Sequence, residues 1–195
     1  MKKIILKAAL ITVGALAVAG ILIFSLWILI SPQSMATASE KLHNYHFAVT
    51  CANLKYKYSD DTSDLARCVE DSILARDDEL IVKYGEQLID RQDFDKLCAL
   101  RDEQLTPQVG QYTTADYKTY VISTLAAAQY RAGNLEKAVQ TAERGGTVNC
   151  FRKLIIEVLS SNNQADIEKV QTLPKDADLR AAIGSFVNNL SQTQN

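Results

Sequence analysis

The sequence is poor in residues that break helices and in residues that enzymes commonly use for catalysis. It contains only three prolines, at positions 32, 107 and 174, and two histidines among its 195 residues. Few stretches alternate β-branched and polar residues, so the pattern favours helices over strands. The motifs H-E-x-x-H, G-x-S-x-G and G-x-x-x-x-G-K-S/T, which mark metalloproteases, serine hydrolases and phosphate-binding loops, are absent. We therefore expect an all-α protein that is not an enzyme and holds no cofactor.

Charge is missing from one long stretch, Ala8–Ile30. At about 1.5 Å per residue this stretch would form a helix about 34 Å long, and a hydrocarbon core is about 30 Å thick. Lys2, Lys3 and Lys7 precede it, and the next basic residue is Lys41. The positive-inside rule therefore places the N-terminus in the cytoplasm and the rest of the chain outside, as in a single-pass protein of the cell membrane.

A cleaved secretory signal is the alternative to a membrane anchor, because Ala36-Thr37-Ala38 resembles a signal-peptidase site. The apolar core of a signal peptide spans about 7–15 residues, however, and the stretch here is longer. We therefore expect an uncleaved anchor. The expected order is a cytoplasmic N-terminus at 1–7, a transmembrane helix at 8–30, a linker at 31–38, an extracytoplasmic helical domain at 39–190 and a polar tail at 191–195.

The part of the chain beyond residue 31 is acidic. It holds all 23 acidic residues and 18 of the 21 basic residues, so its net charge is −5. This charge argues against nucleic acid and against an anionic membrane surface as partners. The length of this part suits one domain with a sizeable core.

The four cysteines, at positions 51, 68, 98 and 150, are not spaced for metal binding. No C-x-x-C pair exists, so neither a zinc knuckle nor a thioredoxin-type site is expected. Disulfides are permitted in an exported domain. Cys51 and Cys68 flank an expected turn near Ser59-Asp60 at similar distances, and in an antiparallel helix hairpin they would stand at the same height. They are therefore the candidate disulfide, and two buried free thiols are the alternative.

Capping residues mark the expected helix ends. Asp77 or Asp78 would begin one helix, and Thr113 followed by Asp116 resembles a capping box. Gly133 would end a helix and Asn134 would begin the next one. Short helices joined by such tight turns predict helical repeats.

One segment, LAAAQYRAGNLEKAVQTAERG at 125–145, resembles a tetratricopeptide repeat. Small and apolar residues fall where that repeat places its packing residues, namely at Leu125, Ala126, Ala128, Gly133, Leu135 and Ala138. Ile122 is a departure, because the repeat has an aromatic residue there. Weaker copies are YGEQLIDRQDFDKLCAL at 84–100, with Gly85, Phe94 and Leu97 in matching places, and IIEVLSSNNQADIEKV at 155–170. The resemblance implies an α-solenoid of stacked antiparallel helix pairs. A single helix pair cannot bury its own apolar face, so each pair needs a neighbouring pair to cover it.

In tetratricopeptide-like stacks the first helix of each pair lines a concave groove. The resemblance therefore implies a surface that binds a protein or peptide partner, formed by Glu86, Tyr120, Ser123, Ala127, Tyr130 and Arg152. Tyrosine suits such a surface, because it offers a large contact area with few rotatable bonds. Core packing, or an ordinary exposed position without a binding role, is the alternative for these tyrosines. We expect a membrane-anchored scaffold that binds its partner outside the cytoplasm.

Two other functions fit the sequence. His43 and His46 lie three residues apart on an expected helix, with Glu40 as a third ligand, so a cell-envelope metal-binding protein or enzyme is one alternative. A solvated helix is the simpler interpretation of these histidines, and we expect no metal. The other alternative is a structural oligomer held together by its membrane helices.

Overall fold

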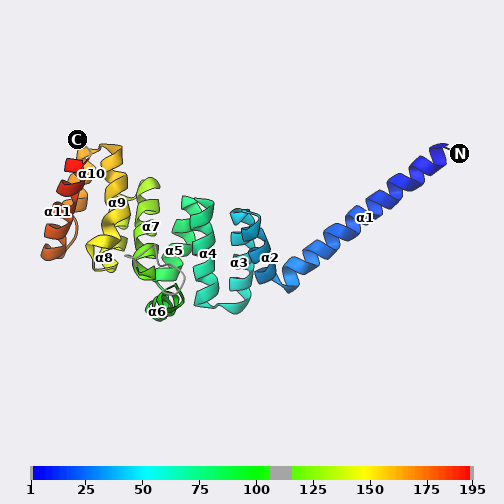
Figure 1. Cartoon of the computed structure of the whole chain (residues 1–195), viewed down its shortest axis with the longest axis horizontal. Helices are drawn as coiled ribbons and strands as arrows, with labels where there is room; N and C mark the ends of the chain where they lie inside the picture. The colour runs from blue at the N-terminus through cyan, green and yellow to red at the C-terminus, as the bar shows by residue number, and fades with distance from the viewer. Residues whose placement is uncertain (1, 106–115, 194–195) are drawn as a thin grey trace.

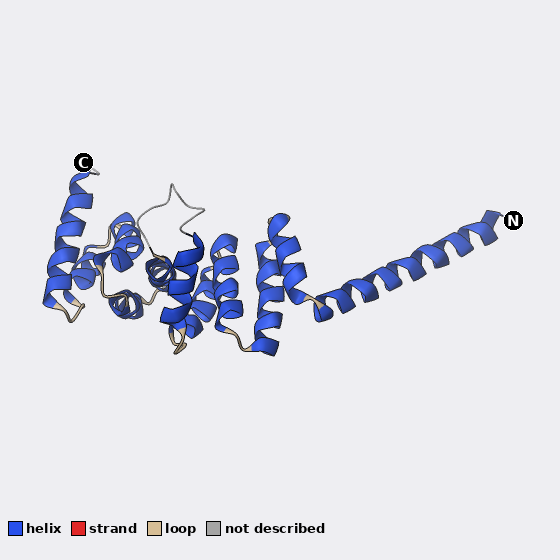
Figure 2. Cartoon of the chain, turned by 60° about the horizontal axis from the view of Figure 1, so that its bottom comes forward, coloured by secondary structure: helices blue, strands red, loops and turns tan. Residues whose placement is uncertain are grey.

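The computed structural model describes residues 2–105 and 116–193 of the chain (Figure 1). Within these residues the protein is all-helical and has no strand (Figure 2), which confirms the all-α part of the predicted fold. The eleven helices of the described part are α1 (Lys2–Ile30), α2 (Pro32–Lys41), α3 (Tyr45–Ser59), α4 (Thr62–Ala75), α5 (Asp78–Ile89), α6 (Phe94–Leu105), α7 (Tyr117–Arg131), α8 (Leu135–Arg144), α9 (Val148–Ser161), α10 (Gln164–Thr172) and α11 (Ala177–Thr193).

Helix α1 projects away from all the other helices (Figure 1). From Thr12 to Ile30 it is long and apolar enough to cross a membrane, and this stretch is not buried inside the protein. Near its C-terminal end it contacts the rest of the chain, where Ile28 is partly buried and Phe24 stacks on Phe47. Residues 12–30 of the apolar run identified in the sequence therefore form one exposed helix.

Residues 31–38 differ from the linker expected there, because most of them belong to α2. Only Ser31 separates α1 from α2. Pro32 occupies the first helical position of α2, where its missing N–H leaves no bond unmade and its fixed φ suits a helix. Met35 and Ala36 are buried on one side of α2 and pack against Cys51 of α3. Burial of this small apolar face therefore orders a segment that is polar by composition.

The helix expected from Ser39 onward is interrupted by a turn. Helix α2 ends at Lys41, and His43 has a left-handed backbone with φ of 56°. The side chain of Asn44 then accepts a hydrogen bond from the backbone N of Phe47 at 3.3 Å, which caps α3. His43 consequently lies in a turn, outside the helix on which it was expected.

The capping residues predicted for α5 and α8 are present, and the cap of α7 differs from the predicted capping box. The carboxylate of Asp77 accepts a hydrogen bond from the backbone N of Leu80, and the Asn134 side chain accepts one from Lys137. Gly133 has φ of 83°, a conformation that favours glycine. At α7 the cap is Asp116 itself, and Thr113 lies outside the described residues.

The helices beyond α1 form a row in which α2, α3, α4, α5, α7, α9 and α11 each pack against the next (Figures 1 and 2). Helix α8 packs against α7 and α9, and α10 packs against α9 and α11. Helix α6 differs, because it packs against α7 and α4 more closely than against α5, which precedes it. The segment at 84–100 therefore lacks the close helix pair that 125–145 forms.

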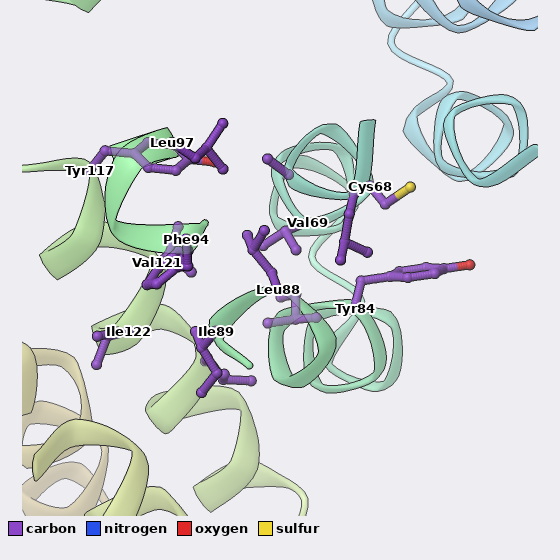
Figure 3. Packing of buried hydrophobic residues seen from close by; sticks show 14 of the residues in the cluster. Cys68, Val69, Tyr84, Leu88, Ile89, Phe94, Leu97, Tyr117, Val121 and Ile122 are labelled. Atoms are coloured by element: carbon purple, nitrogen blue, oxygen red, sulfur yellow. The ribbon is translucent and has the colours of Figure 1, made fainter. Parts of the chain in front are cut away.

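Two hydrophobic clusters meet at α7. Leu125 belongs to the cluster that α3 to α7 share, and its neighbour Ala126 belongs to the cluster of α8 to α11. Figure 3 shows side chains of the first cluster reaching inward from α4, α5, α6 and α7. A Cβ atom at Gly85 of α5 would lie 3.0 Å from Cδ1 of Leu125, so the glycine permits the close approach of α5 and α7.

Candidate functional site

A groove of about 460 Å³ runs across α5, α7 and α9 and reaches the end of α4. We call it the α5–α7–α9 groove, and it is lined by Ile73, Arg76, Asp78, Ile81, Thr124, Ala127, Arg131, Lys153, Ile156 and Glu157. Its lining combines aliphatic side chains with five charged ones. Ile156 is notable because 43% of its surface remains exposed. An exposed apolar side chain within a concave charged surface is typical of a binding site.

Arg131, the last residue of α7, holds the three main helices of the groove together. Its Nε and Nη2 atoms donate to the two carboxylate oxygens of Asp78 on α5, at 2.7 and 2.6 Å. Its Nη1 atom donates to Oε1 of Glu157 on α9 at 2.6 Å. The hydrogen bond with Asp78 is the main cause that raises the pKa of Arg131. Both acidic side chains of the groove are thus paired with one guanidinium group.

Lys153 of α9 has no carboxylate within ion-pair distance among the described residues. Its Nζ atom donates to Oγ1 of Thr124 and lies 4.7 Å from the ring centroid of Tyr120. Burial, followed by the positive charge of Arg131, lowers the pKa of Lys153. An anion placed beside Nζ would offset both effects. Lys153 is therefore a cation of the groove that is available to pair with a negative group.

The structure places the six residues predicted for the binding surface in different surroundings. Ala127 lines the groove, and Ser123 is buried close by on the same helix. Tyr120 is partly buried beneath the Lys153 ammonium group. Arg152 is exposed but does not line the groove.

The other two predicted residues take part in contacts between helices. Glu86 accepts a hydrogen bond from Nε2 of Gln129 at 2.9 Å and forms an ion pair with Lys137 at 2.7 Å. The Tyr130 hydroxyl donates to Oγ of Ser161 at 2.8 Å. These contacts tie α5 to α8 and α7 to α9, so both side chains stabilise the packing.

Sequence reasoning missed Thr124, Arg131 and Lys153, which line the groove. Each follows a predicted residue by one position. One step along a helix turns the side chain by about 100°, so an alignment that is wrong by one residue selects the wrong face. The buried neighbour Leu154 indicates that Lys153 lies at the edge of the buried face of α9. The apolar residues that follow Lys153, from Leu154 to Ile156, were the signal available in the sequence.

The candidate disulfide is not formed, because Cys51 and Cys68 are both free thiols. Cys51 packs with Met35 and Ala36 under α2, whereas Cys68 belongs to the cluster around α4 and α5. The two cysteines thus match the alternative of buried thiols. Burial raises the pKa of Cys51, and it raises the pKa of Cys68 to about 12. Equal height along a hairpin did not fix the rotation of each helix about its axis.

The residues of the metal-binding alternative do not converge. His43 Nδ1 lies 3.0 Å from the hydroxyl of Tyr45, and His46 lies 3.6 Å from the carboxylate of Asp77. Glu40 accepts two hydrogen bonds from Arg67 instead. Among the described residues, no group of three or more side chains could hold a metal ion.

A polar cluster joins α2 to α4. Arg67 donates to Oε1 of Glu40 from Nε at 2.9 Å and from Nη2 at 2.6 Å, and Nη2 also donates to Oγ1 of Thr37 at 2.7 Å. Asp71 lies beneath this pair with 2% of its surface exposed, and its Oδ2 atom has no hydrogen-bond partner. Burial, followed by the charge of Glu40, raises the pKa of Asp71. The cluster therefore holds a carboxyl group that is costly to ionise.

No protein-family model, no curated protein and no solved structure matches this chain. The function is therefore inferred from the geometry of the chain itself. The lining of the α5–α7–α9 groove contains neither histidine nor cysteine. Its side chains can form ion pairs, hydrogen bonds and apolar contacts, which are the interactions by which proteins bind their partners.

Proposed function

We propose that this protein is a non-enzymatic, membrane-anchored scaffold that binds a segment of a partner protein in the α5–α7–α9 groove. In this proposal α1 crosses the cell membrane once, with Lys2, Lys3 and Lys7 on the cytoplasmic side. The helical domain then lies outside the cytoplasm. The length and exposure of Thr12–Ile30 support this arrangement.

We further propose that α5 to α11 form a tetratricopeptide-like solenoid. The first helices of the proposed pairs, α5, α7 and α9, pack in succession. Each second helix contributes two apolar residues three positions apart: Phe94 with Leu97, Leu135 with Ala138, and Ile167 with Val170. The contacts of α7 with α8 and of α9 with α10 support two such pairs, and α6 is a departure from the pattern.

The observation that carries the binding proposal is Lys153 beside exposed Ile156. The ammonium group of Lys153 lacks an acidic partner among the described residues, while both acidic side chains of the groove are paired with Arg131. Arg76, at the other side of the groove, is exposed and adds a second cation. A partner segment that carries a carboxylate and an apolar side chain would satisfy Lys153 and cover Ile156.

Site-specific crosslinking in cells tests the groove. A photoreactive amino acid replaces Ile156, and the matched control replaces Leu100 of α6, which is 47% exposed and does not line the groove. We expect a defined protein adduct from position 156 that is absent from position 100. Lys153→Glu should reduce the adduct by about ten-fold, since a repulsive charge would replace an attractive one. Equal adducts from both positions, or none from 156, would refute the proposal.

Orientation is tested separately by adding protease to spheroplasts. We expect cleavage in the helical domain and protection of the N-terminal residues. Cleavage restricted to lysed cells would place the domain in the cytoplasm.

A further inference from the structure

The start of α3 lies beside the apolar part of α1 and not beyond its end. The rings of Phe24 on α1 and Phe47 on α3 are stacked, with centroids 6.2 Å apart and planes at 14°. Phe24 precedes the last residue of α1, Ile30, by about 9 Å at about 1.5 Å per residue. Ile28 and Phe47 also pack against the small cluster under α2. If α1 spans a bilayer, this contact brings the turn between α2 and α3 to the level of the membrane surface.

The residues of this turn suit a membrane interface. We call Leu42–Phe47 the hairpin tip. Leu42 is 78% exposed, although it is a large apolar residue. His43 and His46 are exposed, and the hydroxyl of Tyr45 makes its hydrogen bond within the tip. Amphipathic rings and apolar side chains of this kind are favoured at the level of lipid headgroups.

Charge around the hairpin tip also fits a lipid surface. The domain is acidic overall, but the sequence from Lys41 to Ser59 contains no Asp or Glu. The nearest carboxylate before it, Glu40, is held by Arg67, and Asp77 lies beside His46. The overall charge of −5 therefore does not describe the local surface. The hairpin tip itself contains no Asp or Glu, and the carboxylates nearest to it are paired with Arg67 or His46. Its charge is therefore compatible with contact to a neutral, zwitterionic bilayer.

The hairpin tip is also firmly connected to α1. A single residue, Ser31, joins α1 to α2, and its backbone N donates to the carbonyl of Trp27 at 2.9 Å. Arg67 ties Glu40 and Thr37 of α2 to α4. The depth of α1 in a membrane would therefore set the position of the tip and of the domain behind it.

We infer that the hairpin tip rests in the headgroup region of the bilayer that α1 crosses, with Leu42 as its apolar contact. This inference rests on the membrane anchor of the proposed function. The lipid is a second contact for the domain, and it holds the α5–α7–α9 groove at a fixed height above the membrane.

Quenching of tryptophan by brominated lipids tests the inference in the full-length protein. The protein is reconstituted in phosphatidylcholine vesicles whose acyl chains are brominated close to the headgroup. Trp27 is the only tryptophan, so the wild type reports on α1. The W27F/L42W variant reports on the hairpin tip. The matched control is W27F/Y58W, because Tyr58 is 71% exposed at the opposite end of α3.

We expect wild type and W27F/L42W to lose about half of their fluorescence and W27F/Y58W to lose less than about a tenth. Both substituted residues are exposed, so far-UV circular dichroism should show unchanged helix content. Quenching of Trp27 without quenching of W27F/L42W would overturn the inference and leave the anchor intact. Equal quenching of all three proteins would overturn it as well, since the whole domain would then lie on the bilayer. Absence of quenching for Trp27 would instead refute the anchor and the proposed function with it.

Discussion

Neither α1 nor α7 divides clearly into a polar face and an apolar face, yet their surroundings are opposite. Residues 121–129 of α7 are all buried, because α5, α8 and α9 surround that helix. Residues 12–30 of α1 are exposed almost throughout. Other helices cover α7 on most sides, whereas α1 is apolar on every side and receives no such cover from them. For α1 the cover must come from outside the described fold.

The polar side chains of the two helices show why their environments differ. In α7, Gln129 is buried and its Nε2 atom donates to Glu86 of α5. Such a group needs a partner on a neighbouring helix. In α1, Ser25 donates to the carbonyl of Ile21 within the same helix at 2.8 Å. A helix that satisfies its own polar groups can enter lipid, whereas one that depends on its neighbours cannot.

The largest expected difference comes from a charge placed in each helix. Ala126→Lys in α7 should unfold the domain, because residue 126 is completely buried and a lysine there would be overpacked and unpaired. Val18→Lys in α1 should leave thermal unfolding of the domain in detergent unchanged. It should reduce the membrane-bound fraction, at a cost of about 3 kcal/mol for insertion. Circular dichroism and membrane flotation measure the two effects. A domain that unfolds with Val18→Lys would contradict the separation of α1 from the core.

Truncation of a leucine should lower the free energy of unfolding of the domain when the leucine lies in α7 and leave it nearly unchanged when the leucine lies in α1. The expected difference is smaller than that caused by an introduced charge. Leu125→Ala should lower the free energy of unfolding of the domain by about 2–5 kcal/mol, because it opens a cavity against Gly85. Leu16→Ala in α1 should change it by less than about 0.5 kcal/mol, since Leu16 is exposed. Urea unfolding in detergent provides the comparison. Similar losses for both variants would mean that α1 packs on the domain.

Asp71 should make the stability of the region between α1 and α7 depend on pH. Its pKa is raised in the folded protein, so the carboxyl ionises at lower pH in the unfolded chain. Stability should therefore fall as the pH rises above about 4, at a cost of about 1.4 kcal/mol per unit of pKa shift. Asp71→Asn should remove part of this loss and be more stable than wild type at pH 8. Glu103→Gln on α6, at an exposed position, is the control and should follow the wild-type profile.

The smallest expected effect concerns the ion pairs at the end of α7. Arg131→Gln should cost about 0.5–1 kcal/mol of stability, because the guanidinium and both carboxylates are about one-third exposed and screened by water. The loss should shrink in 1 M salt, which removes the same interaction from the wild type. Unfolding curves at low and high salt measure it. A loss that does not respond to salt would indicate that Arg131 acts through packing of its aliphatic stem.

Much of the helical architecture could be predicted from local sequence, and the site only in part. The starts of α5, α7 and α8 agree with the expected caps, because Asp77, Asp116 and Asn134 each act within one helical turn. Helix α2 was missed because its order depends on burial of Met35 against α3. Of the residues predicted for the binding surface, Ala127 lines the groove and the others do not.

The sequence by itself determined the apolar helix Thr12–Ile30, the all-helical fold and the helix starts that Asp77, Asp116 and Asn134 cap. These properties depend on hydrophobic composition and on hydrogen bonds between residues a few positions apart. The tertiary structure alone decided that Arg131 meets Asp78 and Glu157, that Cys51 and Cys68 are free buried thiols, and that Phe24 stacks on Phe47. Such contacts depend on how each helix is rotated and crossed against its neighbours, and no local pattern in the chain encodes that rotation.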